Sequence, residues 1–152
     1  MNADFIDYQD NKGFYISNIF IQLIIYYINE EFKGSQYALT NKNSILNYHE
    51  SVINGHQSGY FSLCWNLYLT DLTEEQSMIQ ILQTVKTTIQ NKGAFVSVSE
   101  LQSIPTSDSD FKLFYKKPFP TVELIKILDA LIQMLQGTWT STDYDMEISY
   151  NY

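Results

Sequence analysis

The sequence contains no arginine, and nine lysines are its only strongly basic residues. Arginine is the usual residue for bidentate contacts with phosphate and guanine, and a net charge of −8 repels a polyanion at long range. Both features disfavour nucleic-acid binding. Codon bias in an AT-rich genome is the simpler origin of the missing arginine, since Asn, Lys, Ile and Tyr are plentiful, but the consequence for binding is the same.

Cysteine and long apolar runs are also scarce. The single cysteine, Cys64, excludes an internal disulfide framework and fits a reducing compartment. The most apolar stretch, 14–28, is shorter than the run of about 20 apolar residues that spans a membrane, and it contains Ser17, Asn18 and Gln22. No secretory leader pattern is present at the N-terminus. We therefore expect a cytoplasmic protein that does not insert into a membrane.

Motifs that carry enzyme chemistry are missing as well. There is no Gly-x-Ser-x-Gly elbow, and the six glycines are spread singly, so no phosphate-binding glycine loop is formed. His49 and His56 have no sulfur ligand or second acid at a recognisable metal-site spacing, so we expect surface histidines and no metal. The acidic pairs at 74–75 and 108–110 are explained by helix capping and by a solvated loop. The sequence predicts neither an enzyme nor a cofactor.

The stretch 60–99 is the most regular part of the chain. Apolar and polar residues alternate from 60 to 69, which predicts a half-buried strand. Thr73 precedes two glutamates and a glutamine, which indicates that it caps a helix, and apolar residues then recur at helical spacing as far as Ile89. The β-rich segment 94–99 predicts a second strand. The expected unit is strand, helix, strand.

Three further helices are expected. The stretch 14–28 is apolar around most of a helical wheel, so it is either the central helix of the domain or the seam of a homodimer. Helical spacing of apolar residues predicts a shorter helix at 44–54. The stretch 121–135 has a broad apolar arc between Pro120 and Gly137, which suit the start and the end of a helix.

The segments around the last of these helices are expected to be loops and strands. The stretch 100–110 contains Pro105 among Ser, Thr and Asp and is predicted to be a loop, and 111–115 is predicted to be a strand. Lysines 112, 116 and 117 fit a strand edge that resists aggregation better than a phosphate site. The segment 138–152 is either a frayed tail or an edge strand, and the alternation at 146–150 favours the strand.

These elements predict one α+β domain over residues 1–152, with a small, mainly antiparallel sheet of three or four strands packed by three or four helices. In size, acidity, tyrosine content and α+β pattern the chain resembles the small acidic immunity proteins that neutralise bacterial toxins. The resemblance implies a non-catalytic inhibitor whose carboxylates cover a basic cleft of a cognate toxin domain, for example a nuclease. The alternatives are a structural or regulatory homo-oligomer joined through 14–28, and a small-molecule binding domain lined by Tyr and Phe.

Carboxylates beside aromatic residues and outside helix caps are the best candidates for capturing a basic partner. Two stretches have this character, and the alternative is that both carry ordinary solvated acids. The candidate residues are Glu100, Asp108 and Asp110 in the first stretch, and Trp139, Asp143, Tyr144, Asp145 and Glu147 in the second.

Overall fold

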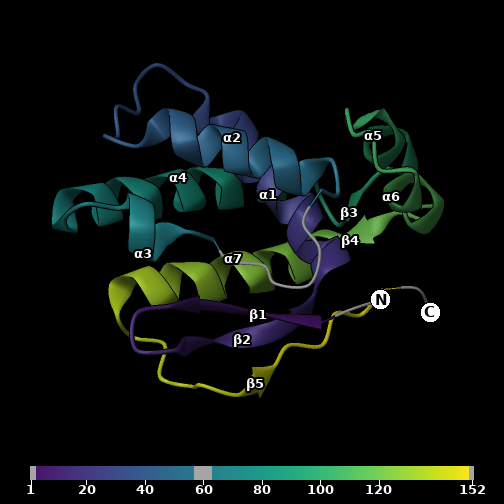
Figure 1. Ribbon diagram of the computed structural model, residues 1–152. Helices are drawn as coiled ribbons and strands as arrows, with labels where there is room; N and C mark the ends of the chain where they lie inside the picture. Colours follow the sequence, from purple (N-terminus) through teal and green to yellow (C-terminus); the bar gives the residue numbers. More distant parts are fainter. Residues whose placement is uncertain (1–2, 57–62, 151–152) are drawn as a thin grey trace.

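The computed structural model describes residues 3–56 and 63–150 (Figure 1). Its strands are β1 (Ala3–Tyr8), β2 (Lys12–Ser17), β3 (Phe95–Val96), β4 (Phe119–Pro120) and β5 (Tyr144–Asp145). Its helices are α1 (Asn18–Phe32), α2 (Lys42–Ile53), α3 (Trp65–Tyr68), α4 (Leu72–Gln90), α5 (Val98–Ser103), α6 (Ser109–Phe114) and α7 (Thr121–Gln136). The arrangement is α+β, as the sequence predicts, with more helices than expected.

The elements lie in layers (Figure 1). α7 covers the inner face of the three-stranded sheet formed by β1, β2 and β5, α4 and α1 pack against α7, and α2 covers α1. The short elements β3, β4, α5 and α6 form the end of the molecule at the right of the view. The buried apolar side chains of all these layers belong to one core.

Helix α1 is the centre of this core. Eleven of its 15 residues are buried, and Glu30 is its only exposed residue. The helix therefore has no exposed apolar face, which favours the central-helix interpretation over the dimer seam. The expected start was too early: residues 14–17 belong to β2, because the apolar run hides the boundary between a strand and the helix that follows it.

Two polar side chains of α1, Gln22 and Asn29, are buried and form hydrogen bonds with α2 and with the start of α6. The Gln22 amide nitrogen donates to the Ile53 carbonyl oxygen at 2.8 Å and to the Asp108 carboxylate at 3.0 Å. Asn29 Oδ1 lies 3.1 Å from His49 Nδ1. His49 is thus a buried member of the helix interface, and the prediction of two surface histidines is wrong for it, although His56 is exposed.

The N-terminal hairpin of β1 and β2 was not predicted. β1 and β2 pair antiparallel from Ala3 opposite Ser17 to Tyr8 opposite Lys12. The turn between them holds Gln9, Asp10 and Asn11 at φ of 44°, 57° and 58°, in the left-handed region that Asp and Asn tolerate better than most residues.

The sheet is mixed, with the order β1-β2-β5, because β5 pairs parallel to β2. The expectation of a mainly antiparallel sheet holds for β1 with β2 and for the separate ribbon of β3 with β4. The last strand lies at 144–145, so the prediction of a strand at 146–150 is wrong. Met146 and Tyr150 alternate with polar residues because their side chains are buried in the core, and the Met146 amide still donates to the Tyr15 carbonyl oxygen of β2 at 2.8 Å.

The predicted strand at 60–69 is wrong where the structure describes it, and residues 60–62 lie outside the described part. Cys64 takes a left-handed conformation at φ 60°, and α3 follows it. Leu63, Trp65 and Leu69 are buried as expected, but Leu67 is 71% exposed. One short helical turn with buried apolar residues on either side thus gives the same alternation of apolar and polar residues as a strand.

The helix at 73–90 is confirmed as α4, with its apolar residues buried and its start moved to Leu72. The capping residue is Asp71, whose carboxylate accepts a hydrogen bond from the Glu74 amide at 2.9 Å. The Glu74 carboxylate in turn accepts three hydrogen bonds, from the amide and hydroxyl of Thr40 and from the amide of Thr70. Thr73 is therefore not the cap. The helix at 44–54 is likewise confirmed as α2, and that at 121–135 as α7, which ends at Gly137 with φ 77°.

Residues 94–115 contain more helix than predicted. β3 is two residues long, and Ser97 then caps α5, its hydroxyl accepting from the Glu100 amide at 3.1 Å. α6 replaces the predicted strand at 111–115, and its N-cap is Asp108. An aspartate is as typical of a loop as of a helix start, so the sequence did not indicate this helix. Lys112 donates to the carbonyls of Gln102 and Ile104 at the end of α5. Its role is to cap a helix, not to protect a strand edge.

Shortening the buried leucine side chains of α4 or α7 should destabilise the fold. Leu82 and Leu128 are fully buried, so replacing either with Ala should cost about 2–5 kcal/mol through lost apolar transfer and a cavity. Urea unfolding measures the loss. Leu72→Ala is the matched control on α4, since Leu72 is 66% exposed and its loss should stay within about 0.5 kcal/mol. Losses below about 1 kcal/mol at both core positions would contradict the packing.

Acid should destabilise the chain through His49. Burial lowers the pKa of His49 from 6.5 to about 3, so between these values the unfolded chain binds a proton that the folded chain excludes. The stability that neutral His49 gives to the folded chain is fully present above about pH 6.5 and is lost as the pH falls towards about 3. Over this range the free energy of unfolding falls by at most about 1.4 kcal/mol per pH unit. In urea unfolding across this range, His49→Gln should flatten the pH dependence and His56→Gln should not. Equal pH dependence in the two variants would refute the assignment.

Candidate partner-binding surface

The first candidate stretch is bound into the fold. Glu100 lies in the first turn of α5, where it accepts a hydrogen bond from the Tyr27 hydroxyl and pairs with Lys92 at 2.8 Å. The Lys92 ammonium also lies 5.3 Å from the centre of the Tyr27 ring. Burial acts to raise the pKa of Glu100, but the bonds from Lys92 and Tyr27 outweigh it and hold that pKa below its ordinary value. Glu100 therefore joins α1, α4 and α5.

Asp108 is also used internally, whereas Asp110 is not. One Asp108 oxygen caps α6 by accepting from the Asp110 amide at 3.0 Å, and the other accepts from Gln22. Asp110 is exposed in the first turn of α6, where its charge is favourable near the helix N-terminus. Two of the three acids in this stretch are thus held by a helix cap or by internal bonds. The stretch was a candidate because its acids were expected to be free of such roles.

The second candidate stretch contains β5, which pairs with β2 on the side away from β1. Its carboxylates Asp143, Asp145 and Glu147 are all exposed, and the only side-chain partner in the described part of the chain is the Ser141 hydroxyl, 3.3 Å from Asp143. Tyr144 is 46% exposed. These acids can face a partner without giving up an internal contact.

Trp139 fixes this stretch to the sheet. Its indole nitrogen donates to the Gly13 carbonyl oxygen at 2.8 Å, and its ring lies edge-on to those of Phe14, at 5.6 Å, and Tyr144, at 5.5 Å. Trp139 therefore positions the acids, and its half-buried ring is not the exposed anchor expected from the sequence.

The sheet brings three further residues to these acids. On the outer face, away from α7, Phe5 of β1 lies opposite Tyr15 of β2 with ring centres 4.8 Å apart, and Tyr15 is 42% exposed. Asp145 is the register partner of Tyr15 on its other side, and Asp7 is two residues along β1 on the same face. We call Phe5, Asp7, Tyr15 and Asp145 the acidic sheet face.

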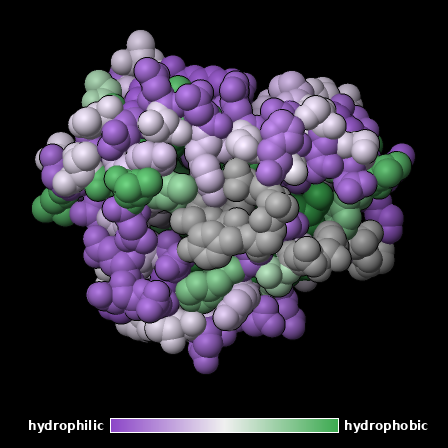
Figure 2. Space-filling view, in the orientation of Figure 1, coloured by the Kyte–Doolittle hydropathy of each residue, from purple (hydrophilic) through white to green (hydrophobic). Residues whose placement is uncertain are grey.

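Sequence reasoning missed Phe5, Asp7 and Tyr15 because it missed the hairpin. Two features could have indicated it: the alternation of Phe5 and Asp7 with the buried residues Ile6 and Tyr8, and the turn-forming residues at 9–11. Figure 2 shows another side of the surface, where hydrophilic residues predominate and apolar residues form separate small groups.

None of the ion pairs within residues 3–56 and 63–150 involves the acidic sheet face. β1 has none, and Lys12 of β2 belongs by alternation to the opposite face, with Phe14. Six lysines make internal contacts elsewhere: Lys33, Lys86, Lys92 and Lys126 pair with Glu30, Asp129, Glu100 and Glu123, and Lys42 and Lys112 bond to backbone carbonyls.

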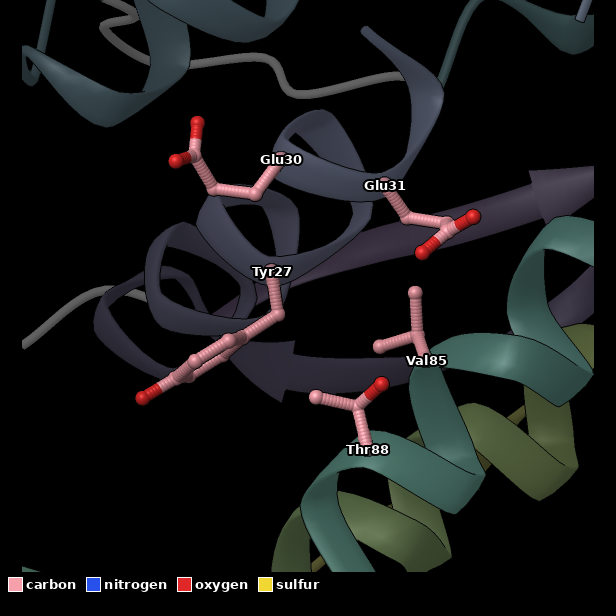
Figure 3. A pocket seen from close by; sticks show the side chains of 5 residues that line it. All are labelled: Tyr27, Glu30, Glu31, Val85 and Thr88. Carbon is pink, nitrogen blue, oxygen red and sulfur yellow. The ribbon is translucent and has the colours of Figure 1, made fainter. Parts of the chain in front are cut away.

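A pocket of about 150 Å³ lies between α1 and α4 (Figure 3). Tyr27, Glu30 and Glu31 line it from α1, and Val85 and Thr88 from α4. Glu31 accepts a hydrogen bond from the Tyr37 hydroxyl at 2.6 Å, and Glu30 pairs with Lys33. The pocket is smaller than the range of about 300–1,000 Å³ that is usual for small-molecule sites.

Within residues 3–56 and 63–150, no group of three or more His, Cys, Asp or Glu side chains is arranged to hold a metal ion. The same residues include no helix with the length and apolar character needed to cross a bilayer. Comparison of the chain with protein-family models, curated proteins and solved structures gave no match.

The two candidate stretches should differ in their effect on stability. Asp108→Ala removes a helix cap and the partner of the buried Gln22 amide, so it should cost about 1–3 kcal/mol in urea unfolding. Asp145→Ala removes an exposed carboxylate and should change the stability by less than about 0.5 kcal/mol. Similar losses for the two variants would show that Asp145, too, has a structural role.

Proposed function

We propose that the chain is a non-catalytic, cytoplasmic protein-binding module of the toxin-immunity kind, which binds and inhibits a basic toxin domain. The observation that carries this proposal is the set of carboxylates beside the sheet aromatics, of which Asp145 and Glu147 are exposed and Asp7 is half-buried. Asp7, Asp145 and Glu147 have no side-chain partner in the described part of the chain, so a basic partner can desolvate them without breaking the fold. The net charge of −8 adds long-range attraction to such a partner.

The alternatives have less physical support. A homo-oligomer joined through α1 would need an apolar surface on that helix, and α1 exposes only Glu30. The pocket between α1 and α4, at about 150 Å³, is smaller than the usual small-molecule site and gives that alternative no support. The partner class, a protein and not a nucleic acid, follows from the negative charge and from the absence of arginine.

Co-expression tests the proposed activity directly. Each open reading frame next to this gene is expressed in a bacterial host with and without the chain. One product should arrest growth alone and fail to do so when the chain is present, and the two purified proteins should form a complex. If none of the toxic neighbours is neutralised, the immunity function fails.

Charge removal should then slow association through the second candidate stretch. In the triple variant Asp143→Asn, Asp145→Asn, Glu147→Gln, the association rate at low salt should fall by about tenfold and its salt dependence should flatten. The control Glu30→Gln, Glu50→Gln, Asp110→Asn removes the same charge from α1, α2 and α6, where all three residues are exposed. Equal rates for the two triple variants would contradict a local role for the acids along β2.

A further inference from the structure

Resting on the proposed function, we infer that the acidic sheet face receives an arginine side chain of the basic partner. The guanidinium stacks on the Phe5 and Tyr15 rings and pairs with the carboxylate of Asp145, with Asp7 as a second acceptor. The overall charge of the chain favours any basic partner, whereas this surface selects a guanidinium group.

The two rings form a platform on neighbouring strands. Their centres are 4.8 Å apart and their planes are inclined by 54°, so together they present a broader surface than one ring. Tyr15 is 42% exposed, and its register partners on the two neighbouring strands are Phe5 and Asp145. A planar cation can therefore lie against the platform from solvent.

The carboxylates stand on both sides of this platform. Asp145 neighbours Tyr15 across the β2 and β5 pair, and Asp7 lies diagonally across the β1 and β2 pair. Same-face neighbours in a sheet have Cα atoms about 4.5–8 Å apart, so a guanidinium over Tyr15 reaches either carboxylate. In the described part of the chain neither carboxylate has an ion pair or a side-chain hydrogen bond that would compete.

This combination favours arginine over lysine. A guanidinium is planar and weakly hydrated, and it can stack on a ring while it donates two parallel hydrogen bonds to one carboxylate. An ammonium is a compact and strongly hydrated charge that gains less from the ring. Because the chain contains no arginine, neither its own side chains nor a second copy can supply the group.

Peptides of equal charge separate stacking from simple attraction. Blocked hexaarginine and hexalysine are titrated into the ¹⁵N-labelled chain at low ionic strength, and amide chemical shifts are followed. Hexaarginine should bind at least about threefold more tightly, with the largest shifts at Phe5, Tyr15 and Asp145. Tyr15→Ser and, independently, Asp145→Asn should remove this preference. Phe95→Ser should keep it, because Phe95 is 51% exposed on β3, outside the three-stranded sheet.

The outcomes distinguish this inference from the proposed function. Equal affinity for the two peptides, with shifts at the acidic sheet face, overturns the arginine preference and leaves the acidic binding function standing. Shifts confined to another surface overturn the location as well. If neither peptide binds at low ionic strength, both the inference and capture of a basic partner by this face fail.

Discussion

The burial of nearly all of α1 is the constraint on which the rest of the structure depends. An apolar helix with one exposed residue has to be covered by neighbours on every side, and α2, α4 and α7 together with the sheet provide this cover. The same burial requires internal partners for Gln22 and Asn29, because an unpaired buried amide would cost about 1–3 kcal/mol. Asp108 and His49 supply these partners. Two residues that the sequence suggested for binding or for the surface are thus explained by the environment of one helix.

The distribution of charge follows from this packing. Glu100 and Asp108 join helices around α1, and most of the lysines make internal contacts that hold helix ends and helix pairs together. Among the acids without such partners in the described part of the chain, Asp145 and Glu147 lie at the C-terminal edge of the sheet, whereas Glu50 and Asp110 are exposed on α2 and α6. A net charge of −8 does not by itself say where on the surface the carboxylates lie. The folded chain places Asp145 beside two exposed rings, those of Tyr15 and Tyr144.

The sequence predicts the helices of this protein much better than its strands. α4 and α7 were identifiable because each carries an apolar stripe over several turns with residues suited to its ends. The strand at 60–69 was wrong because burial of Leu63, Trp65 and Leu69 gives the same alternation in a short turn of helix. The hairpin was missed because its acidic outer positions resemble a solvated lead segment. Of the candidate residues, Asp145 could be found from its charge and neighbours, but Tyr15 becomes its neighbour only through parallel pairing between distant segments.

The lack of arginine connects this architecture with partner choice. A second copy of the chain carries the same carboxylates and has few lysines that are not already engaged, so two acidic sheet faces repel each other. Under the proposed function, a basic partner experiences the opposite field and brings arginine, the cationic side chain that this protein lacks. Discrimination then comes from both sides: attraction to arginine-bearing surfaces, and repulsion of copies of the chain itself and of polyanions. Under that proposal the Tyr15 ring and the Asp145 carboxylate together separate arginine from general attraction to positive charge, because stacking and paired hydrogen bonds both depend on the planar shape of the guanidinium.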